Sequence, residues 1–202
     1  MNEVLVPADR VARWVVNFES RHGDTMLAVA NGSLTGRATD GSTFVARLPF
    51  ETTYAGPADA VAFAAAVVAP DRWGVLLVRK GGFAVARLEG TTLVEHKIGQ
   101  RHVQGRTKAG GQSQQRFARR RDNQARQAYE AAAEHAARIL GQVALPVVTG
   151  GDHAAVDEVL ADPRLRRLVV TGPRLAIPDP RRAVLDAAIA DARSVRIVVV
   201  NA

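Results

Sequence analysis

The feature that most constrains the fold is a run of helix-forming residues, 113–140, that directly follows a stretch without hydrophobic periodicity. Residues 105–112 contain three glycines and no apolar pattern, which is typical of a loop. Ser113 is a suitable N-cap, and apolar residues at helical spacing beyond it supply one inward face. At about 1.5 Å per residue the helix would be roughly 40 Å long. We therefore expect a loop that leads straight into a long helix, and a helix that projects the loop away from the domain.

Positive charge is concentrated in and around the same stretch. Residues 96–126 contain nine lysines and arginines against Asp122 alone, whereas the whole chain has a formal net charge of +7. The block is therefore +8 and the remainder is −1. A basic block on an otherwise neutral domain is typical of a protein that binds a polyanion in one place. The pI of about 10.9, without an amphipathic basic stripe at a terminus, favours nucleic acid over a membrane surface.

The first hundred residues predict helices and an antiparallel meander. Residues 9–21 have helical apolar spacing, and Gly23 is placed to end that helix. An alanine-rich helix is expected from Gly56-Pro57 to residue 68. Short β-branched segments between turn signals predict strands at 25–30, 34–38, 43–48, 73–78, 83–88 and 91–98.

The last sixty residues alternate between strand and helix patterns. Strands are expected at 143–148, 168–170 and 195–200, with helices after Asp152 and after Asp179-Pro180. Such alternation is typical of parallel strands joined by crossover helices. The sequence therefore predicts an α/β fold with a mixed central sheet, flanking helices and one long helix after the loop.

The length and the composition favour one domain over residues 1–202. With 202 residues and 47% hydrophobic content the chain can bury a substantial core. We divide this domain into a helix and strand meander (1–100), a basic loop with its long helix (101–140) and a βαβαβ part (141–202). The N-terminus lacks a signal-peptide pattern, and no apolar run approaches the roughly 18 residues that span a membrane. We expect a cytoplasmic protein.

Neither a metal site nor a cofactor site is predicted. The chain has no cysteine, and its five histidines lack metal-ligand spacing. Gly150-Gly151 lies between a strand and a helix, but it is not part of a dinucleotide fingerprint or a Walker motif. We expect no metal, no cofactor and no nucleotide at this glycine pair.

The loop ends in Gly110-Gly111-Gln112. The two glycines permit positive φ and a close approach of the backbone to a ligand, and the glutamine adds an amide side chain and a backbone N–H. By itself a three-residue motif also fits a mobile glycine loop before a solvated helix. The residues that follow it are more specific.

Gly110-Gly111-Gln112-Ser113, followed by Arg116-Phe117-Ala118-Arg119 and Arg121, resembles the catalytic loop and helix start of a known domain. This is the central domain of eukaryotic and archaeal-type peptide-chain release factors. The run is also similar to the same domain in the Vms-type release-factor-like peptidyl-tRNA hydrolases, including bacterial (actinobacterial) relatives. The close resemblance covers about residues 106–126.

The resemblance implies a peptidyl-tRNA hydrolase, a carboxylic ester hydrolase that acts in the peptidyl-transferase centre of the large ribosomal subunit. Gly110 and Gly111 would give the loop its backbone shape. The backbone N–H of Gln112 would stabilise the developing oxyanion or the leaving hydroxyl, and its side chain would position the attacking water. Glutamine has no useful pKa, so it orients water and is not a base.

The resemblance also implies the partners, which are large-subunit rRNA and peptidyl-tRNA. Basic side chains on the loop and helix would neutralise phosphates: Arg106, Lys108, Arg116, Arg119, Arg120 and Arg121. A chain of this length has no room for a codon-reading domain, so we expect rescue of stalled ribosomes without recognition of stop codons. We expect a monomer off the ribosome and no interaction with a membrane.

Two other functions remain open from the residues alone. A non-catalytic ribosome-binding or RNA-binding module would need the arginines but not Gln112. A metal-dependent nuclease would need clustered carboxylates, for which the candidates are Asp152, Asp157, Glu158 and Asp162. Asp152 beside His153 is also explained by a helix cap next to a surface histidine. Serine or cysteine hydrolase chemistry lacks both a cysteine and a G-x-S-x-G elbow.

Overall fold

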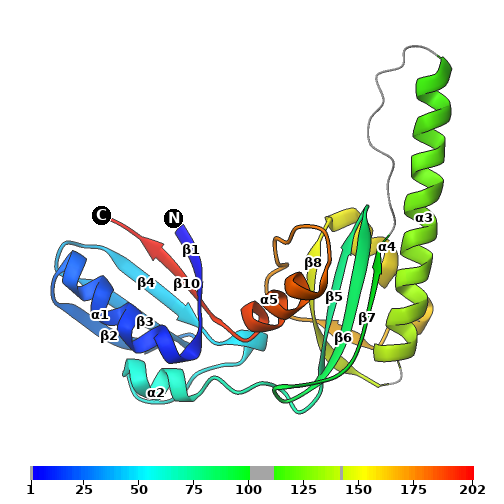
Figure 1. Ribbon diagram of the computed structural model, residues 1–202. Coiled ribbons are helices and arrows are strands. Elements are labelled where there is room, and N and C mark those ends of the chain that lie inside the picture. Colours follow the sequence, from blue (N-terminus) through cyan, green and yellow to red (C-terminus); the bar gives the residue numbers. More distant parts are fainter. Residues whose placement is uncertain (1, 101–111, 142) are drawn as a thin grey trace. The chain divides into compact units, whose positions relative to one another are not determined.

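The computed structural model describes residues 2–100, 112–141 and 143–202, with residues 112–125 described by their backbone alone. Contacts divide the chain into two compact units. Unit 1 contains Met1–Pro70 and Ile189–Ala202, and unit 2 contains Asp71–Ala188. The protein is of the mixed α/β class, as predicted, and each unit contains one five-stranded sheet (Figure 1). None of the described helices is both long and apolar enough to cross a membrane.

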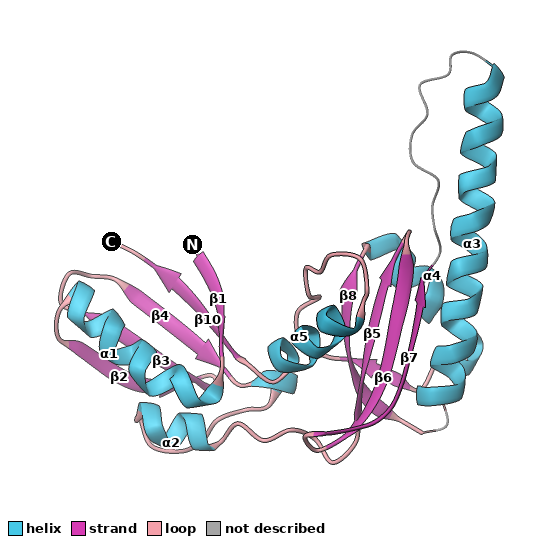
Figure 2. Ribbon diagram, viewed as in Figure 1, coloured by secondary structure: helices cyan, strands magenta, loops and turns pink. Residues whose placement is uncertain are grey.

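Unit 1 contains an antiparallel sheet, two α-helices and two short 3-10 helices. Its strand order is β1-β10-β4-β3-β2. The strands are β1 (Asn2–Val6), β2 (Thr25–Ala30), β3 (Ser33–Ala38), β4 (Thr43–Arg47) and β10 (Val195–Val200). The helices are η1 (Ala8–Arg10), α1 (Val11–His22), η2 (Pro49–Glu51) and α2 (Ala60–Ala65). Figure 2 shows these elements by type.

Buried side chains alternate with more exposed ones along β3, β4 and β10, and the buried ones form the core of unit 1. Leu34, Phe44 and Ile197 are buried and form one cluster with Val15 and Phe18 of α1. A Cβ on Gly36 would lie 2.1 Å from Cε1 of Phe44, so this glycine leaves room for the aromatic ring on the facing strand. α1 ends as predicted, since the N–H of Gly23, at φ +90°, donates to the carbonyl of Glu19.

Two sequence expectations in unit 1 are corrected. α2 begins at Ala60, not at Pro57, because Oδ1 of Asp59 accepts the N–H of Ala62 at 2.7 Å and caps the helix there. Pro57 lies in the preceding turn, where its carbonyl accepts the hydroxyl of Tyr54 at 2.9 Å. β10 is not a parallel strand of a βαβαβ series, since it pairs antiparallel with both β1 and β4.

Unit 2 contains a mixed sheet of order β7-β6-β5-β8-β9. Its strands are β5 (Trp73–Arg79), β6 (Gly82–Glu89), β7 (Thr92–Gln100), β8 (Leu145–Gly151) and β9 (Leu168–Val170). β5, β8 and β9 run parallel, and β5, β6 and β7 form an antiparallel meander. Its helices are α3 (Gln112–Leu140), α4 (His153–Leu160), η3 (Pro163–Leu165) and the first residues of α5 (Arg182–Ala192), which continues into unit 1.

Helices cover both faces of this sheet. α3 and α4 share one cluster with strand residues of the same face, including Leu76, Val85 and Val147. α5 lies on the opposite side of the sheet (Figure 1), where its Leu185 is fully buried. β5 is buried from Trp73 to Val78, as expected for a strand with both faces covered.

Candidate functional site

The predicted site lies on α3, whose C-terminal half is anchored on the sheet of unit 2. Ala128, Ala132, Ala136, Ile139 and Leu140 are all buried. They recur at helical spacing, and most of them have small side chains, so the helix axis approaches the strands closely. This half of α3 therefore forms a rigid base for the half that precedes it.

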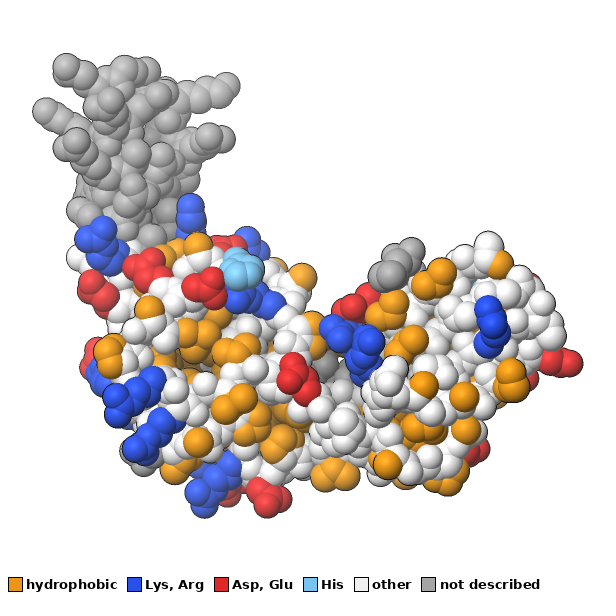
Figure 3. All heavy atoms as spheres, turned by 180° about the vertical axis from the view of Figure 1, so that it is seen from behind, with side chains coloured by type: hydrophobic (Ala, Val, Ile, Leu, Met, Phe, Trp, Pro, Cys, Tyr) orange, Lys and Arg blue, Asp and Glu red, His pale blue; other side chains and the backbone are white. Residues whose placement is uncertain are grey.

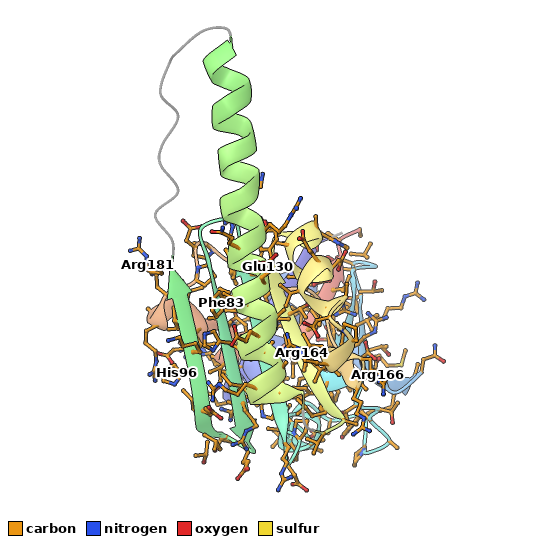
Figure 4. All side chains as sticks on the ribbon, turned by 90° about the vertical axis from the view of Figure 1, so that its right-hand side faces the viewer. Phe83, His96, Glu130, Arg164, Arg166 and Arg181 are labelled. Carbon is orange, nitrogen blue, oxygen red and sulfur yellow. The ribbon has the colours of Figure 1, made fainter. Side chains whose placement is uncertain are left out.

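Two contacts tie α3 to the meander of the sheet. Arg138 in the last turns of α3 forms an ion pair with Glu95 in β7. The rings of His135 and Phe83 stack with centroids 5.6 Å apart and an interplanar angle of 28°. Figure 4 shows Phe83 in β6 beside α3, and His96 in β7. These contacts fix the direction in which α3 leaves the sheet.

The N-terminal half of α3 continues past the end of the sheet (Figure 1). Between Gln112, its first residue, and Ala128, its first buried residue among the described side chains, the helix rises by roughly 24 Å. The helix begins one residue before the predicted Ser113.

The structure places the predicted site residues in two groups. Gln112, Arg116, Arg119, Arg120 and Arg121 all belong to the first ten residues of α3. Gly110, Gly111, Arg106 and Lys108 lie outside the described residues. Because β7 ends at Gln100 and α3 begins at Gln112, residues 101–111 join the meander to the far end of the helix.

A hollow of about 340 Å³ lies at the base of this helix, between α3 and the ends of β6 and β7. One lysine and no carboxylate line it. The lining residues are Gly82, Phe83, Lys97, Ile98, Gly99, Gln100, Ala128, Ala131 and His135. The sequence analysis did not single out His135 or its neighbours. The signal for them was the series Ala128, Ala131 and His135, which places two small residues and an aromatic on one side of the helix.

The net charge belongs to the predicted block and not to the body of unit 2. Residues 71–188 contain 20 Lys or Arg and 12 Asp or Glu, a net charge of +8, which equals that of residues 96–126 alone. Unit 1 has 7 basic and 8 acidic residues. On the face that Figure 3 shows, the coloured Lys and Arg side chains of unit 2 lie among Asp and Glu side chains. The positive field is therefore centred on β7, the joining segment and α3.

The carboxylates proposed for a nuclease site are held by nearby cations. Asp162 accepts two hydrogen bonds from the guanidinium of Arg164, at 3.0 and 2.7 Å, and one from its backbone N–H, which together lower the pKa of Asp162 to about 2. Hydrogen bonds from His153 and Arg174 lower the pKa of Asp157. Among the described residues, no three His, Asp or Glu side chains are grouped as metal ligands.

Asp152 and Gly151 have structural partners at the ends of β5 and β8. Asp152 is at the N-cap position of α4, but its side chain makes no cap bond, contrary to the expected helix cap. Instead, Oδ2 of Asp152 accepts the backbone N–H of Lys80 at 3.2 Å, and Oδ1 lies 3.4 Å from Nε of Arg79. Gly151 adopts φ +102° and donates to the carbonyl of Leu175. The glycine pair therefore joins the chain segments at this edge.

The protein belongs to the class of release factors, in agreement with the mixed α/β sheet of unit 2 and the long helix that continues past it. More specifically, residues 71–198 match the Actinobacteria/chloroflexi VLRF1 release factor family. This match covers more than half of the chain, and the protein belongs to that family. No curated protein matches the sequence. Membership links the chain to translation and the ribosome, and the match leaves out residues 1–70 and 199–202.

Proposed function

We propose that this protein hydrolyses the ester bond of peptidyl-tRNA in the peptidyl-transferase centre of the large ribosomal subunit. It thereby releases nascent chains from stalled ribosomes without reading stop codons. One observation supports the proposal: Gln112, which directly follows Gly110-Gly111 in the sequence, is the first residue of α3, and side chains between Ala128 and Leu140 of that helix pack on the sheet. Gln112 is therefore at the opposite end of α3 from the turns that pack on the sheet.

The chemistry requires little from side-chain titration. Water attacks the carbonyl carbon of the ester, the bond to the ribose oxygen breaks, and a proton passes to that oxygen. The backbone N–H of Gln112 donates to the developing negative charge, and its amide side chain orients the water, with Gly110 and Gly111 allowing the close approach. A preformed N–H donor of this kind contributes about 3–4 kcal/mol to transition-state stabilisation.

The arginines near the motif fit a binding role. The net charge of residues 96–126 is +8, which equals the net charge of unit 2. Electrostatic attraction to RNA therefore acts mainly on these residues, which we call the arm. Arg106, Lys108, Arg116, Arg119, Arg120 and Arg121 would contact phosphates of rRNA or of the tRNA acceptor end. The proposed partners are accordingly the large subunit and peptidyl-tRNA, and the proposed place of action is the cytoplasm, with the free protein a monomer.

The decisive experiment measures peptide release from peptidyl-tRNA held on large ribosomal subunits. Gln112→Ala removes the amide that orients the water and keeps the backbone N–H, and we expect release to slow by about 10²-fold through loss of orientation while binding to large subunits persists. Gln115→Ala, the same change one helical turn later, is the matched control and should retain release. Equal release by wild type and Gln112→Ala would overturn the proposed chemistry.

The same assay distinguishes the proposed hydrolase from the second candidate function, a non-catalytic RNA-binding module. That function predicts binding to large subunits without release by the wild type. The concentration of charge on the arm supports this candidate as well, whereas the Gly-Gly-Gln tip does not, because electrostatic binding has no need of it. The nuclease alternative gains no support from the carboxylates, since Asp152, Asp157 and Asp162 each form hydrogen bonds with neighbouring groups.

A further inference from the structure

Unit 1 contains a cavity of about 310 Å³ between α1 and the free ends of β1 and β10. All of its lining residues lie outside the family match. The residues that line it are Asn2, Val4, Trp14, Asn17, Phe18, Arg21, His22, Val199 and Asn201. All of them belong to unit 1.

The helix side of the cavity is an aromatic ladder. Trp14, Phe18 and His22 follow one another at a spacing of four residues along α1, with centroid separations of 5.7 and 4.6 Å. Nδ1 of His22 lies 2.8 Å from Oδ2 of Asp40, which fixes the imidazole at the end of the ladder. The strand side contributes Val4 and Val199, which are partly buried against the core. The cavity therefore has apolar and aromatic walls.

Polar groups without partners surround these walls. Asn2 and Asn201 come from the strands and Asn17 and Arg21 from α1. Among the described residues, no hydrogen bond or ion pair involves the side chains of these four. No carboxylate lines the cavity. Three amides and one guanidinium therefore converge on a cavity with aromatic walls and have their hydrogen-bonding capacity free for a ligand.

We propose that this cavity binds a nucleotide. A carboxamide presents a donor and an acceptor side by side, as the edge of a nucleobase does, and asparagine pairs in this way with adenine. The aromatic ladder offers a surface for a planar base, and Arg21 supplies the cation for a phosphate.

The charge of unit 1 bears on the form of the ligand. Its 7 basic and 8 acidic residues give no positive field, so it does not attract a long polyanion as the arm does. Arg21 is the one guanidinium among the lining residues. Binding therefore depends on one base and one phosphate, and its salt dependence is shallow. The ligand is either a free mononucleotide or one unpaired nucleotide of an RNA strand.

The test is titration of the full chain with each of the four ribonucleoside monophosphates and with unstructured tetranucleotides. The signal is the change in tryptophan fluorescence on adding ligand. This change reports on Trp14, which lines the cavity, because the other tryptophan, Trp73, is fully buried in unit 2. We expect saturable binding with a preference among bases. Tetranucleotides that bind at least tenfold more tightly than mononucleotides identify an RNA strand as the ligand, and equal affinities identify a free nucleotide.

Variants of exposed residues locate the site without disturbing the core. Arg21→Ala should lower the affinity for AMP by about tenfold and leave the affinity for adenosine unchanged, because only AMP carries the phosphate. Asn17→Ala should reduce the preference among bases. Arg13→Ala, which removes the same charge from an exposed position of α1 outside the cavity, is the control and should bind as the wild type does.

Two results would overturn the proposal. One is the absence of saturable binding for every nucleotide up to millimolar concentration, whether or not peptides with a free carboxylate bind. The other is equal AMP affinity in wild type and Arg21→Ala, with circular dichroism showing both chains folded. Neither result depends on peptide release, so the outcome is independent of the chemistry proposed for Gln112.

Discussion

Gly74 in β5 lies directly under Leu140, the last residue of α3. A Cβ at Gly74 would lie 2.7 Å from Cδ2 and 3.3 Å from Cδ1 of Leu140, which is itself 1% exposed. The absence of a side chain at Gly74 therefore allows the C-terminal end of α3 to pack on the strand. This contact sets how closely α3 packs on the sheet of unit 2.

Gly74→Ala should destabilise the protein by about 1–3 kcal/mol, because Leu140 must leave its position. Leu140→Ala should cost about 2–5 kcal/mol through the cavity that it leaves. In the double variant the methyl added at residue 74 occupies the cavity left by Leu140→Ala. Gly74→Ala should therefore cost less stability in the Leu140→Ala background than in the wild type. Chemical denaturation of the four proteins measures this coupling, and strictly additive effects would contradict the packing argument.

Arg79 should hold the segment after β9 in place. Its Nη1 donates to the carbonyl of Ile177 at 2.9 Å, and its Nε lies between Asp152 at 3.4 Å and Asp179 at 3.9 Å. Arg79→Ala leaves that carbonyl without its donor and should cost about 1–3 kcal/mol. Hydrogen exchange should quicken at Leu175, whose N–H donates to Thr149. Lys80→Ala, which keeps the backbone bond of Lys80 to Asp152, should leave exchange unchanged.

Asp162 should contribute to stability against acid. Its pKa is lowered from 3.8 to about 2, first by the side-chain hydrogen bonds of Arg164 and then by the backbone N–H of Arg164. Because the folded pKa is below the unfolded value, the contribution is complete above about pH 4 and is lost as the pH falls towards 2. Asp162→Asn should therefore flatten the loss of stability between pH 4 and 2.

Denaturation midpoints as a function of pH check this expectation. Asp71→Asn is the matched control, since Asp71 is exposed and its carboxylate forms no ion pair in the described part of the chain. A pH profile for Asp162→Asn identical to that of the control would contradict the role of the Arg164 pair. High salt should reduce the difference, because the Arg164 side chain is 57% exposed.

The sequence was sufficient to predict most local elements. The bounds of β2, β9 and β10 agree with the expected strands, and α3 begins within one residue of the prediction. These segments have strong periodicity or clear breakers at their ends. β1 was not predicted, because its five residues, NEVLV, are too short to show a pattern and two of them are exposed.

Long-range pairing was not predictable from the pattern. The series of strand and helix after residue 143 suggested that residues 195–200 form another parallel strand, yet β10 pairs with β1 from the start of the chain. Alternation specifies which segments are strands but not which partner each one finds, since cross-strand packing depends on residues far away in the sequence. The cavity in unit 1 follows from the same pairing, because it brings Asn2 and Asn201 to one side of α1.

The salt dependence of binding to large subunits tests the role of the arm. Changing Arg119, Arg120 and Arg121 together to Ala removes up to three phosphate contacts, each of which adds about 0.7–0.9 to the slope of log K against log salt. We expect the slope to fall by roughly 2–3 and the affinity to drop, with Gln112→Ala leaving both unchanged. Arg166→Ala with Arg167→Ala is the control, because these two exposed arginines lie outside the basic block. If the control lowers the slope and the triple variant leaves it unchanged, the body of unit 2 contacts the RNA and the arginines of α3 do not.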